Sequence, residues 1–339
     1  MLIPRQTSAR RTRLCLLVGA LIIGGVVFHQ LRYLFDFIFA GKLSDSIEVL
    51  DSCSRQSPGL KPSNDPPSHQ HATVPGIPNK VHQIWKTSNI STYAAGASCD
   101  SWKNVYEPLN YTVKLWPEAE IVELIASKYS WLLPTYLSYP YNIQRADIAR
   151  LVVVHSEGGM YMDLDVRPRS VENTQCLQNR GLDGVFASTG GTRGLSNHFL
   201  MAEQGSAFLE FVLREAVRRA PASRLILLPY IQVFWSTGPM MLTSTFLHYA
   251  KTNPAAASRV AVLTETYGKT IMGHMPGRSW HSWDGQLLNM IGDVFSPHNK
   301  KLWMPLVMPV LSISIAASVI VGVLVYLRRR CVYEAVKLH

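Results

Sequence analysis

"RADIARLVVVHSEGGMYMDLDV" (residues 145–166) is the stretch that decides the fold. Its first half has the apolar spacing of a helix and ends at Gly158 and Gly159, a common way for a helix to stop. "MYMDLDV" then has the composition of a buried strand, and its end carries two carboxylates, Asp163 and Asp165. A helix, a tight turn and a buried strand in this order are typical of an α/β domain.

The same alternation continues on both sides of this stretch. Helices are indicated by proline and acidic residues at their starts and by apolar residues at helical spacing, and strands by short apolar runs. The expected strands lie at 77–85, 111–116, 160–166, 183–188, 197–202 and 259–264, with another around residue 271. The expected helices lie at 117–130, 144–157, 206–220 and 236–250. The sequence therefore predicts a Rossmann-type mixed sheet, mainly parallel and flanked by helices.

The two aspartates predict a metal site. Side chains at alternate positions of a strand point to the same face, so the carboxylates of Asp163 and Asp165 would repel each other without a cation between them. Mg²⁺ and Mn²⁺ take such oxygen ligands and share them with a diphosphate, and α/β sheets bind ligands at the carboxyl ends of their strands. A solvated loop is the ordinary alternative for an isolated Asp-x-Asp, and an exposed helix ion pair is the ordinary explanation for Asp147 and Arg150.

Two apolar segments predict transmembrane helices. Residues 303–327 contain no charged residue in 25 positions, and the three arginines that follow place the C-terminus in the cytosol. Residues 14–40 begin with 15 apolar positions and are preceded by four arginines. A cleaved signal peptide would also have such a core, but no small-x-small cleavage site follows it, so an uncleaved signal-anchor is favoured. Either reading places the middle of the chain in the lumen.

The charge distribution agrees with this topology. The formal net charge is +10, of which the first thirteen residues carry +4 and residues 328–339 carry +3. A surplus concentrated in two tails is typical of membrane orientation and argues against a nucleic-acid partner. The expected domains are a cytosolic basic tail (1–13), a signal-anchor (14–40), a Ser- and Pro-rich luminal stem (41–76), a luminal α/β domain (77–300), a transmembrane helix (303–327) and a cytosolic tail (328–339).

The luminal part carries two kinds of modifiable residue. Cys53, Cys99 and Cys176 would lie in an oxidising compartment, where three thiols permit one disulfide and one free thiol, and their spacing does not choose the pair. Asn89 in "NIS" and Asn110 in "NYT" stand in glycosylation sequons, which agree with a luminal location.

Residues 145–166 closely resemble the Asp-x-Asp glycosyltransferases of family 32, whose pattern is an Arg-Ala-Asp helix, a Gly-Gly turn and a Tyr-x-Asp-x-Asp strand end. "IPNKVHQIWKT" (77–87) and "YTVKLWPE" (111–118) resemble the family's first two strands. "LLPYIQVFWSTGP" (227–239) and "SWHSWDG" (279–285) resemble one subgroup, the fungal mannosyltransferases that add mannose to inositol phosphorylceramide. The resemblance implies a GT-A-like glycosyltransferase fold for the luminal domain.

By position, the resemblance implies a role for each matching residue. Asp165 would be the chief metal ligand, with Asp163 beside it on the metal or the donor sugar, and Arg150 would lie against the diphosphate. These three are the expected catalytic residues. The expected substrate-binding residues are His82, Gln83, Trp85, Arg145, Asp147, Gly158, Gly159, Ser279 and Trp280.

Several of these residue types also have ordinary structural roles. His274 and His281 are further candidate metal ligands, but a lone histidine is more often a hydrogen-bonded structural residue. Core packing is the alternative for Trp85, and a purely structural role is the alternative for Arg145.

The implied reaction is retaining transfer of mannose from GDP-mannose to inositol phosphorylceramide, with Mn²⁺ or Mg²⁺ as cofactor. It would take place at the Golgi membrane, with the catalytic domain luminal, both termini cytosolic and a regulatory subunit as a further partner. Two alternatives stay open: an α-mannosyltransferase acting on protein-linked glycans, and a non-catalytic homologue. A transporter is disfavoured because two spans are too few to line a pore.

Overall fold

The structure, a computed structural model, describes residues 19, 24–30, 32–33, 43, 46–53, 76–92, 99–189, 194–274 and 284–285, without the side chains of Thr92 and His274. The chain divides into two compact units, residues 1–280 and 281–339, and all the elements given below lie in the first. No helix in the described part is long and apolar enough to cross a membrane. Segment 303–327, which the sequence predicts to do so, lies outside the described residues, as does most of 14–40.

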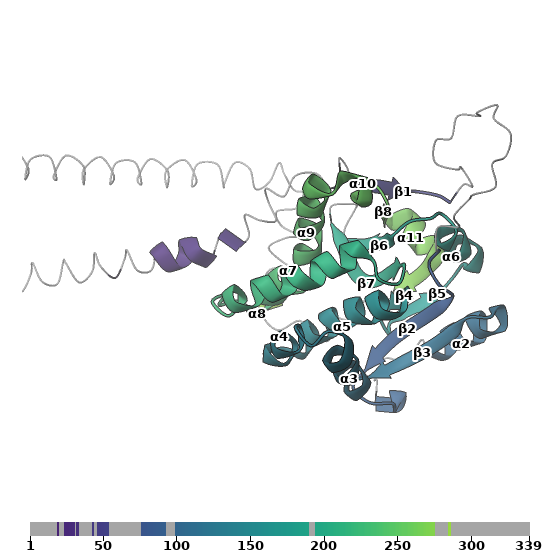
Figure 1. The fold of residues 1–339 in the computed structure, drawn as a ribbon, viewed down its shortest axis with the longest axis horizontal. Helices are drawn as coiled ribbons and strands as arrows, with labels where there is room; N and C mark the ends of the chain where they lie inside the picture. Colours follow the sequence, from purple (N-terminus) through teal and green to yellow (C-terminus); the bar gives the residue numbers. More distant parts are fainter. Residues whose placement is uncertain are drawn as a thin grey trace, which may run out of the picture. The chain divides into compact units, whose positions relative to one another are not determined.

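One mixed sheet forms the centre of the first unit, with the strand order β1-β8-β6-β7-β4-β2-β3 (Figure 1). Only β7 runs antiparallel to its neighbours in this sheet. The strands are β1 (Glu48–Leu50), β2 (Lys80–Trp85), β3 (Thr112–Pro117), β4 (Gly159–Met162), β6 (Gly184–Ser188), β7 (Leu195–Ala202) and β8 (Val260–Leu263). A separate antiparallel pair is formed by β5 (Val166–Pro168) and β9 (Met272–His274). The mainly parallel α/β sheet predicted from the sequence is confirmed.

Helices cover both faces of the sheet because the strands are apolar on both sides. On β4, Tyr161 joins the hydrophobic cluster of one face, whereas Met160 and Met162 join the cluster of the other, as the two-residue period of a strand requires. The first face packs against α3 (Glu118–Lys128), α4 (Leu133–Ser138), α5 (Asn142–Glu157), α7 (Ala207–Ser223), α9 (Pro239–Thr252) and α10 (Pro254–Ala257). The second packs against α2 (Cys99–Tyr106), α6 (Val171–Gln178) and α11 (Glu265–Ile271). Three further short helices are α8 (Pro229–Ser236), η2 (Ile90–Thr92) and η3 (Glu107–Leu109).

Helix α5 and strand β4 meet in a turn that requires glycine. Gly158 has a φ of 65° and Gly159 a φ of 98°, values at which a side chain is strained. A Cβ on Gly159 would lie 2.5 Å from the carbonyl oxygen of Lys80, so the turn packs directly on β2. The expected helix at 144–157 is confirmed, with its start two residues earlier.

The two aspartates follow β4 instead of ending it. The sequence predicts a strand over 160–166, but β4 stops at Met162. The amide of Asp163 donates to the carbonyl oxygen of His198 at 2.9 Å, and the amide of Val166 donates to that of Asp163 at 3.0 Å, which closes a turn. The prediction that a strand places both carboxylates on one face is therefore wrong, and the turn sets their positions instead.

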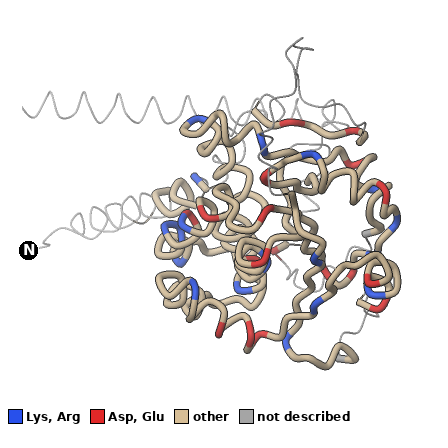
Figure 2. The backbone as a smooth tube through the Cα atoms, turned by 45° about the vertical axis from the view of Figure 1, so that its right-hand side comes forward, with Lys and Arg blue, Asp and Glu red and all other residues tan. Residues whose placement is uncertain are grey.

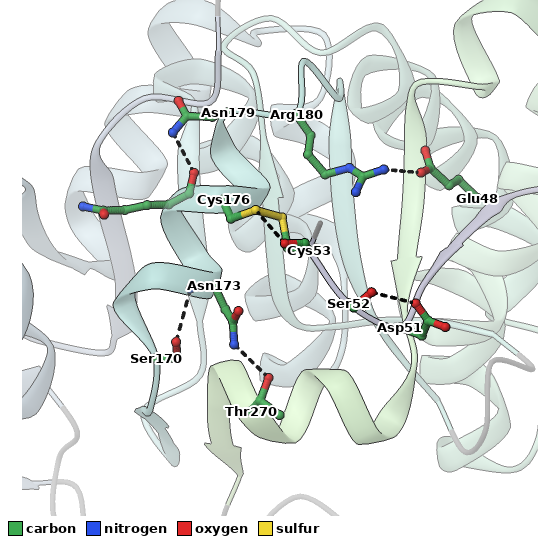
Figure 3. The surroundings of a disulfide bond; sticks show 11 residues. Glu48, Asp51, Ser52, Cys53, Ser170, Asn173, Cys176, Asn179, Arg180 and Thr270 are labelled. Carbon is green, nitrogen blue, oxygen red and sulfur yellow. Dashed lines mark hydrogen bonds and ion pairs between the residues drawn. A yellow bond between two sulfur atoms is a disulfide. The ribbon is translucent and has the colours of Figure 1, made fainter. Parts of the chain in front are cut away.

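Part of the expected stem belongs to the domain. β1 pairs in parallel with β8 at the edge of the sheet, so a strand lies in the segment predicted to be a stem. Cys53 follows β1 and forms a disulfide with Cys176 of α6 (Figure 3), and Arg180 reaches Glu48 of β1 at 2.7 Å. The pairing that the spacing left open is therefore Cys53 with Cys176, and Cys99 is a buried free thiol.

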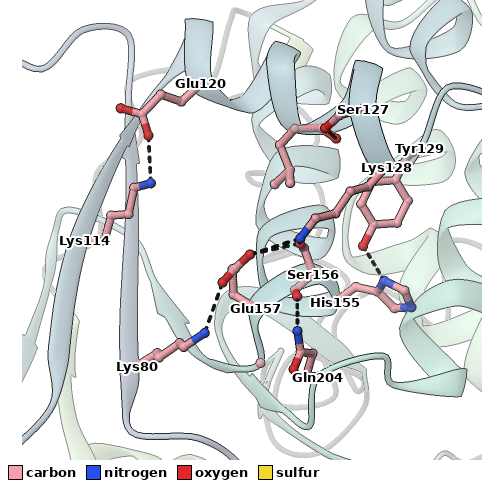
Figure 4. Close-up of polar contacts among 12 residues, drawn as sticks. Lys80, Lys114, Glu120, Ser127, Lys128, Tyr129, His155, Ser156, Glu157 and Gln204 are labelled. Atoms are coloured by element: carbon pink, nitrogen blue, oxygen red, sulfur yellow. Dashed lines mark hydrogen bonds and ion pairs between the residues drawn. The ribbon is translucent and has the colours of Figure 1, made fainter.

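Charges within the described domain are largely balanced in place. Figure 2 shows Lys and Arg interspersed with Asp and Glu along the chain. At the end of α5, for example, the carboxylate of Glu157 lies 3.0 Å from Lys80 and 3.5 Å from Lys128 (Figure 4). This arrangement agrees with the expectation that the surplus positive charge belongs to the two tails.

Candidate functional site

A buried ion pair lies beside the aspartate turn. Arg150 of α5 donates from Nη1 to Asp147 Oδ1 at 3.0 Å, and its Nη2 lies 3.1 Å from Asp163 Oδ1. The side chains of Arg150 and Asp147 are 10% and 4% exposed, so the exposed helix pair considered from the sequence is wrong. A single guanidinium thus joins α5 to the turn at the end of β4.

Asp147 is held by donors from three elements. Besides Arg150, the side-chain amide of Asn197 on β7 donates to Oδ1 at 2.9 Å, and the hydroxyl of Thr237, just after α8, donates to Oδ2 at 2.9 Å. Burial raises the pKa of Asp147, while Arg150, Thr237 and Asn197 oppose that rise. Because both of its oxygens are bonded within the protein, Asp147 fixes the position of Arg150. A contact between Asp147 and the donor sugar stays a prediction.

Asp163 is a largely buried carboxylate in contact with Arg150. The hydroxyl of Tyr161 donates to its Oδ1 at 2.8 Å. Burial raises the pKa of Asp163 to about 6, Arg150 and Tyr161 pull it down, and the nearby charge of Asp165 pushes it up. Burial, with the charge of Asp165, therefore outweighs Arg150 and Tyr161 and disfavours the ionised form of Asp163, which a bound cation would stabilise.

Asp163 and Asp165 fit a hard divalent cation in their chemistry but do not complete its coordination. Asp165 is 9% exposed and offers carboxylate oxygen, the ligand type that Mg²⁺ and Mn²⁺ prefer. Across the described residues, no group of three or more His, Cys, Asp or Glu side chains is placed to hold a metal ion. The remaining ligands of such a cation would have to come from the donor diphosphate, from water or from residues beyond those described.

The C-terminal candidates are placed only in part. The backbone of His274 lies on β9 directly opposite Val166, the residue after Asp165, which brings position 274 beside the aspartate turn. Ser279, Trp280 and His281 lie outside the described residues. The roles of these four residues stay predictions.

His82 has a complete structural role. The indole N–H of Trp116 donates to its Nδ1 at 3.1 Å, so the proton is on Nε2, which donates to the carbonyl oxygen of Gly158 at 2.8 Å. Burial lowers the pKa of His82 to about 4, so the ring is neutral near pH 7. The neutral imidazole links β2, β3 and the glycine turn. With both nitrogens bonded inside the protein, its contact with a nucleotide base stays a prediction.

The other residues of β2 and α5 that were predicted to bind the sugar donor differ in exposure. Gln83 is fully buried, whereas Trp85 is half-buried at the carboxyl end of β2, with Lys86 Nζ 5.9 Å from its ring centre. Arg145 donates to the carbonyl oxygen of Tyr139 at 3.1 Å and to the side chain of Asn142, which supports the structural alternative for this residue.

Three residues of the site were not predicted from the sequence. Tyr161 was recognised only as the tyrosine of the Tyr-x-Asp-x-Asp pattern, without a role of its own, and Thr237 only as part of the stretch 227–239 that resembles one subgroup. Asn197 reaches Asp147 only because β7 runs beside β4, a pairing that no local signal reveals.

Several known proteins are similar to this chain in sequence. Residues 78–179 match the family described as glycosyltransferase sugar-binding region containing DXD motif, and the matched range includes Asp147, Arg150, Asp163 and Asp165. The chain is 34% identical over 229 residues to inositol phosphoceramide mannosyltransferase 3 of Schizosaccharomyces pombe, an alignment that covers 64% of this chain and 58% of that protein. It is 26% identical over 229 residues to the mannosyl phosphorylinositol ceramide synthase SUR1 of Saccharomyces cerevisiae, covering 63% and 54%. The chain thus spans less than two thirds of the length of these relatives.

Among solved structures, the glycosyltransferase PaToxG is similar with a TM-score of 0.36 and 16% sequence identity, over 53% of this chain and 71% of that one.

Proposed function

We propose that this chain, a glycosyltransferase with a DXD sugar-binding region, transfers mannose from GDP-mannose to inositol phosphorylceramide. The observation that supports sugar transfer best is the guanidinium of Arg150, held between Asp147 and Asp163 beside the DXD turn. The donor and the acceptor rest on the mannosyltransferase relatives, which are named for inositol phosphoceramide and mannosyl phosphorylinositol ceramide.

A divalent cation, Mn²⁺ or Mg²⁺, would be held by Asp163 and Asp165. When bound, it would neutralise charge on the two phosphates of the donor. The raised pKa of Asp163 supports this assignment, because a carboxyl group that is costly to ionise in the free protein gains most from a cation beside it. The sheet, with helices on both faces, is compatible with a GT-A-like fold, which we include in the proposal.

The protein's own residues would act through position and charge. As the bond between the anomeric carbon and the phosphate oxygen breaks, its electron pair passes to the departing diphosphate. The acceptor hydroxyl oxygen bonds to the same carbon while its proton passes to an oxygen of that diphosphate. Arg150 would stabilise the growing charge, because a fixed cation in a poorly solvated site interacts more strongly than one in water. Asp147 would keep Arg150 in place. We expect retention of configuration by displacement on one face of the sugar.

The proposed location is the Golgi membrane, with the domain luminal, both termini cytosolic and a regulatory subunit as a further partner. The disulfide between Cys53 and Cys176 supports an oxidising compartment. Both sequon asparagines, Asn89 and Asn110, are exposed and so are accessible to glycosylation.

The deciding experiment supplies labelled GDP-mannose to membranes that contain the full chain, with inositol phosphorylceramide, protein-linked oligomannose glycans and water as competing acceptors. We expect label on the lipid, and none on any acceptor with an Asp165→Ala variant. Label on the glycans alone would favour the protein-glycan mannosyltransferase. Donor binding without any transfer would favour the non-catalytic homologue.

A further inference from the structure

Two leucines lie exposed where α7 turns into α8. Leu225 and Leu227 are 59% and 68% exposed, whereas Ile226 between them is 4% exposed. The apolar run 225–235 is thus largely buried within helix α8 but exposes two of its first three residues. Moving large apolar side chains out of water lowers the free energy, so an exposed cluster of them indicates a contact surface.

The side-chain amide of Gln30 holds this turn at both leucines. Its Nε2 donates to the carbonyl oxygen of Leu225 at 2.9 Å, and its Oε1 accepts from the amide of Leu227 at 2.9 Å. Nearby, Tyr33 is 2% exposed, and its ring lies edge-on to Trp235 of α8 with 4.8 Å between ring centres. The helical segment 24–30 is thus fixed to a turn almost 200 residues away in sequence.

Exposed apolar side chains continue on that helical segment. Val26, Val27 and Phe28 are 44%, 49% and 69% exposed. A helix rises about 1.5 Å per residue, so these residues lie within about one turn of Gln30. They are also the end of the apolar run 14–28 that the sequence predicts to enter a membrane. We call the five residues Val26, Val27, Phe28, Leu225 and Leu227 the anchor face.

We propose that the anchor face dips into the lipid bilayer that receives the N-terminal segment. Continuity is the first reason, because the turn is bonded to Gln30, two residues after the end of the apolar run. The second is charge, because Arg224, exposed beside Leu225, is placed to contact lipid phosphate. The third is composition, because the partly exposed rings of Tyr230 and Phe234 on α8 stack at 4.5 Å, and aromatic residues are enriched at membrane interfaces.

Helix α8 connects the anchor face to the functional site. It begins two residues after Leu227, and Thr237 at its other end donates to Asp147. Eight helical residues span about 12 Å, which is roughly twice the thickness of one headgroup layer. An inositol phosphate headgroup that projects from the membrane would therefore meet the site. This last step rests on the proposed function, whereas the membrane contact itself does not.

A depth measurement on the full chain in phosphatidylcholine nanodiscs tests the contact. A fluorophore is attached at Leu227→Cys in a chain that also carries Cys15→Ser and Cys331→Ser, and its quenching by a lipid spin-labelled below the headgroup is recorded. The matched control is Leu109→Cys, at a 42% exposed leucine in η3, the short helix that follows α2. Helix α2 lies at the other end of the domain from α8 (Figure 1). We expect quenching at least threefold stronger at position 227. Equal quenching at the two positions would overturn the proposal, and so would shielding of position 227 by a second copy of the chain.

An activity measurement separates the contact from the proposed function. Leu225→Ser with Leu227→Ser should raise the apparent KM for bilayer-embedded inositol phosphorylceramide at least fivefold and leave transfer to a short-chain, water-soluble analogue unchanged. Val105→Ser with Leu109→Ser, the matched exposed pair, should change neither. Equal KM values for the two double variants would contradict the membrane contact. If no lipid accepts the sugar at all, the proposed function fails, while the quenching result still decides the contact.

Discussion

Arg150 Nη2 lies 3.1 Å from Asp163 Oδ1, and this contact joins helix α5 to the turn that carries both aspartates. The arginine side chain is 10% exposed and the aspartate side chain 24%, so water screens their attraction only in part. The position of the DXD turn therefore depends on a residue in the preceding helix.

The variant Arg150→Lys tests this dependence. Lysine keeps the charge but lacks the planar fork that reaches two carboxylates at once, so one contact is lost. We expect kcat for sugar transfer to fall about 100-fold, the usual effect of losing one fixed donor. Thermal unfolding should show a folded protein with a slightly lower midpoint. Arg218→Lys, at an arginine on α7 whose side chain is 69% exposed, is the control and should retain full activity.

The variant Asp165→Ala tests the cation. If Asp165 is a metal ligand, transfer should fall at least 1,000-fold, in the range seen for loss of a central electrostatic group. EDTA should inhibit the unaltered enzyme, and Mn²⁺ should restore it. Asp51→Ala, which removes an exposed carboxylate near β1, is the control. Near-normal turnover by Asp165→Ala, or indifference to EDTA, would refute the metal role.

His82 predicts a loss of stability in acid. Its folded pKa of about 4 lies below the usual 6.5, so the unfolded chain binds more protons between these values. The contribution of His82 to the free energy of unfolding should be complete above pH 6.5 and should fall as the pH drops towards 4, by about 2 kcal/mol between pH 7 and pH 5. The raised pKa of Asp163 opposes this loss over the same range, so the His82 effect is read from the difference between variants. Urea unfolding in detergent at the two pH values measures this. His82→Asn should remove this loss, whereas the exposed His248→Asn should retain it.

Alanine variants at two glycines with positive φ distinguish the cost of backbone strain from the cost of steric overlap. A Cβ on Gly159 (φ 98°) would overlap the backbone of Lys80, whereas one on Gly181 (φ 71°) would meet nothing within 4 Å. We expect Gly159→Ala to lower the free energy of unfolding by about 3 kcal/mol and Gly181→Ala by about 1 kcal/mol. Equal losses would show that the turn can move away from β2.

The disulfide should stabilise the domain substantially. Cys53 and Cys176 are 123 positions apart, and a cross-link over so long a loop restricts the unfolded chain strongly. The paired variant Cys53→Ser with Cys176→Ser should lose about 3 kcal/mol and should no longer respond to dithiothreitol. Cys331→Ser, in the C-terminal tail, should behave like the unaltered chain in thermal unfolding.

The helix, the glycine turn and the strand at 142–162 could be predicted because their signals are local. Apolar spacing predicted α5, and paired glycines predicted its end. The turn over Asp163 and Asp165 could not be predicted, because it depends on a hydrogen bond to His198 on a distant strand.

The contacts of Asp147 could not be predicted from the sequence for the same reason. Asn197 and Thr237 come from segments 50 and 90 residues away, and only the packing of β7 and α8 against α5 brings them together. The edge strand at 48–50 was missed because three residues in a polar segment gain strand character only from pairing with β8.

Both ends of residues 54–75 are fastened to the same body, through Cys53 on one side and the chain leading into β2 on the other. A protease that cut within this segment would leave two polypeptides still covalently joined through sulfur. The N-terminal fragment would then separate from the remainder on a denaturing gel only after reduction, so a nicked enzyme would run as an intact one on a non-reducing gel.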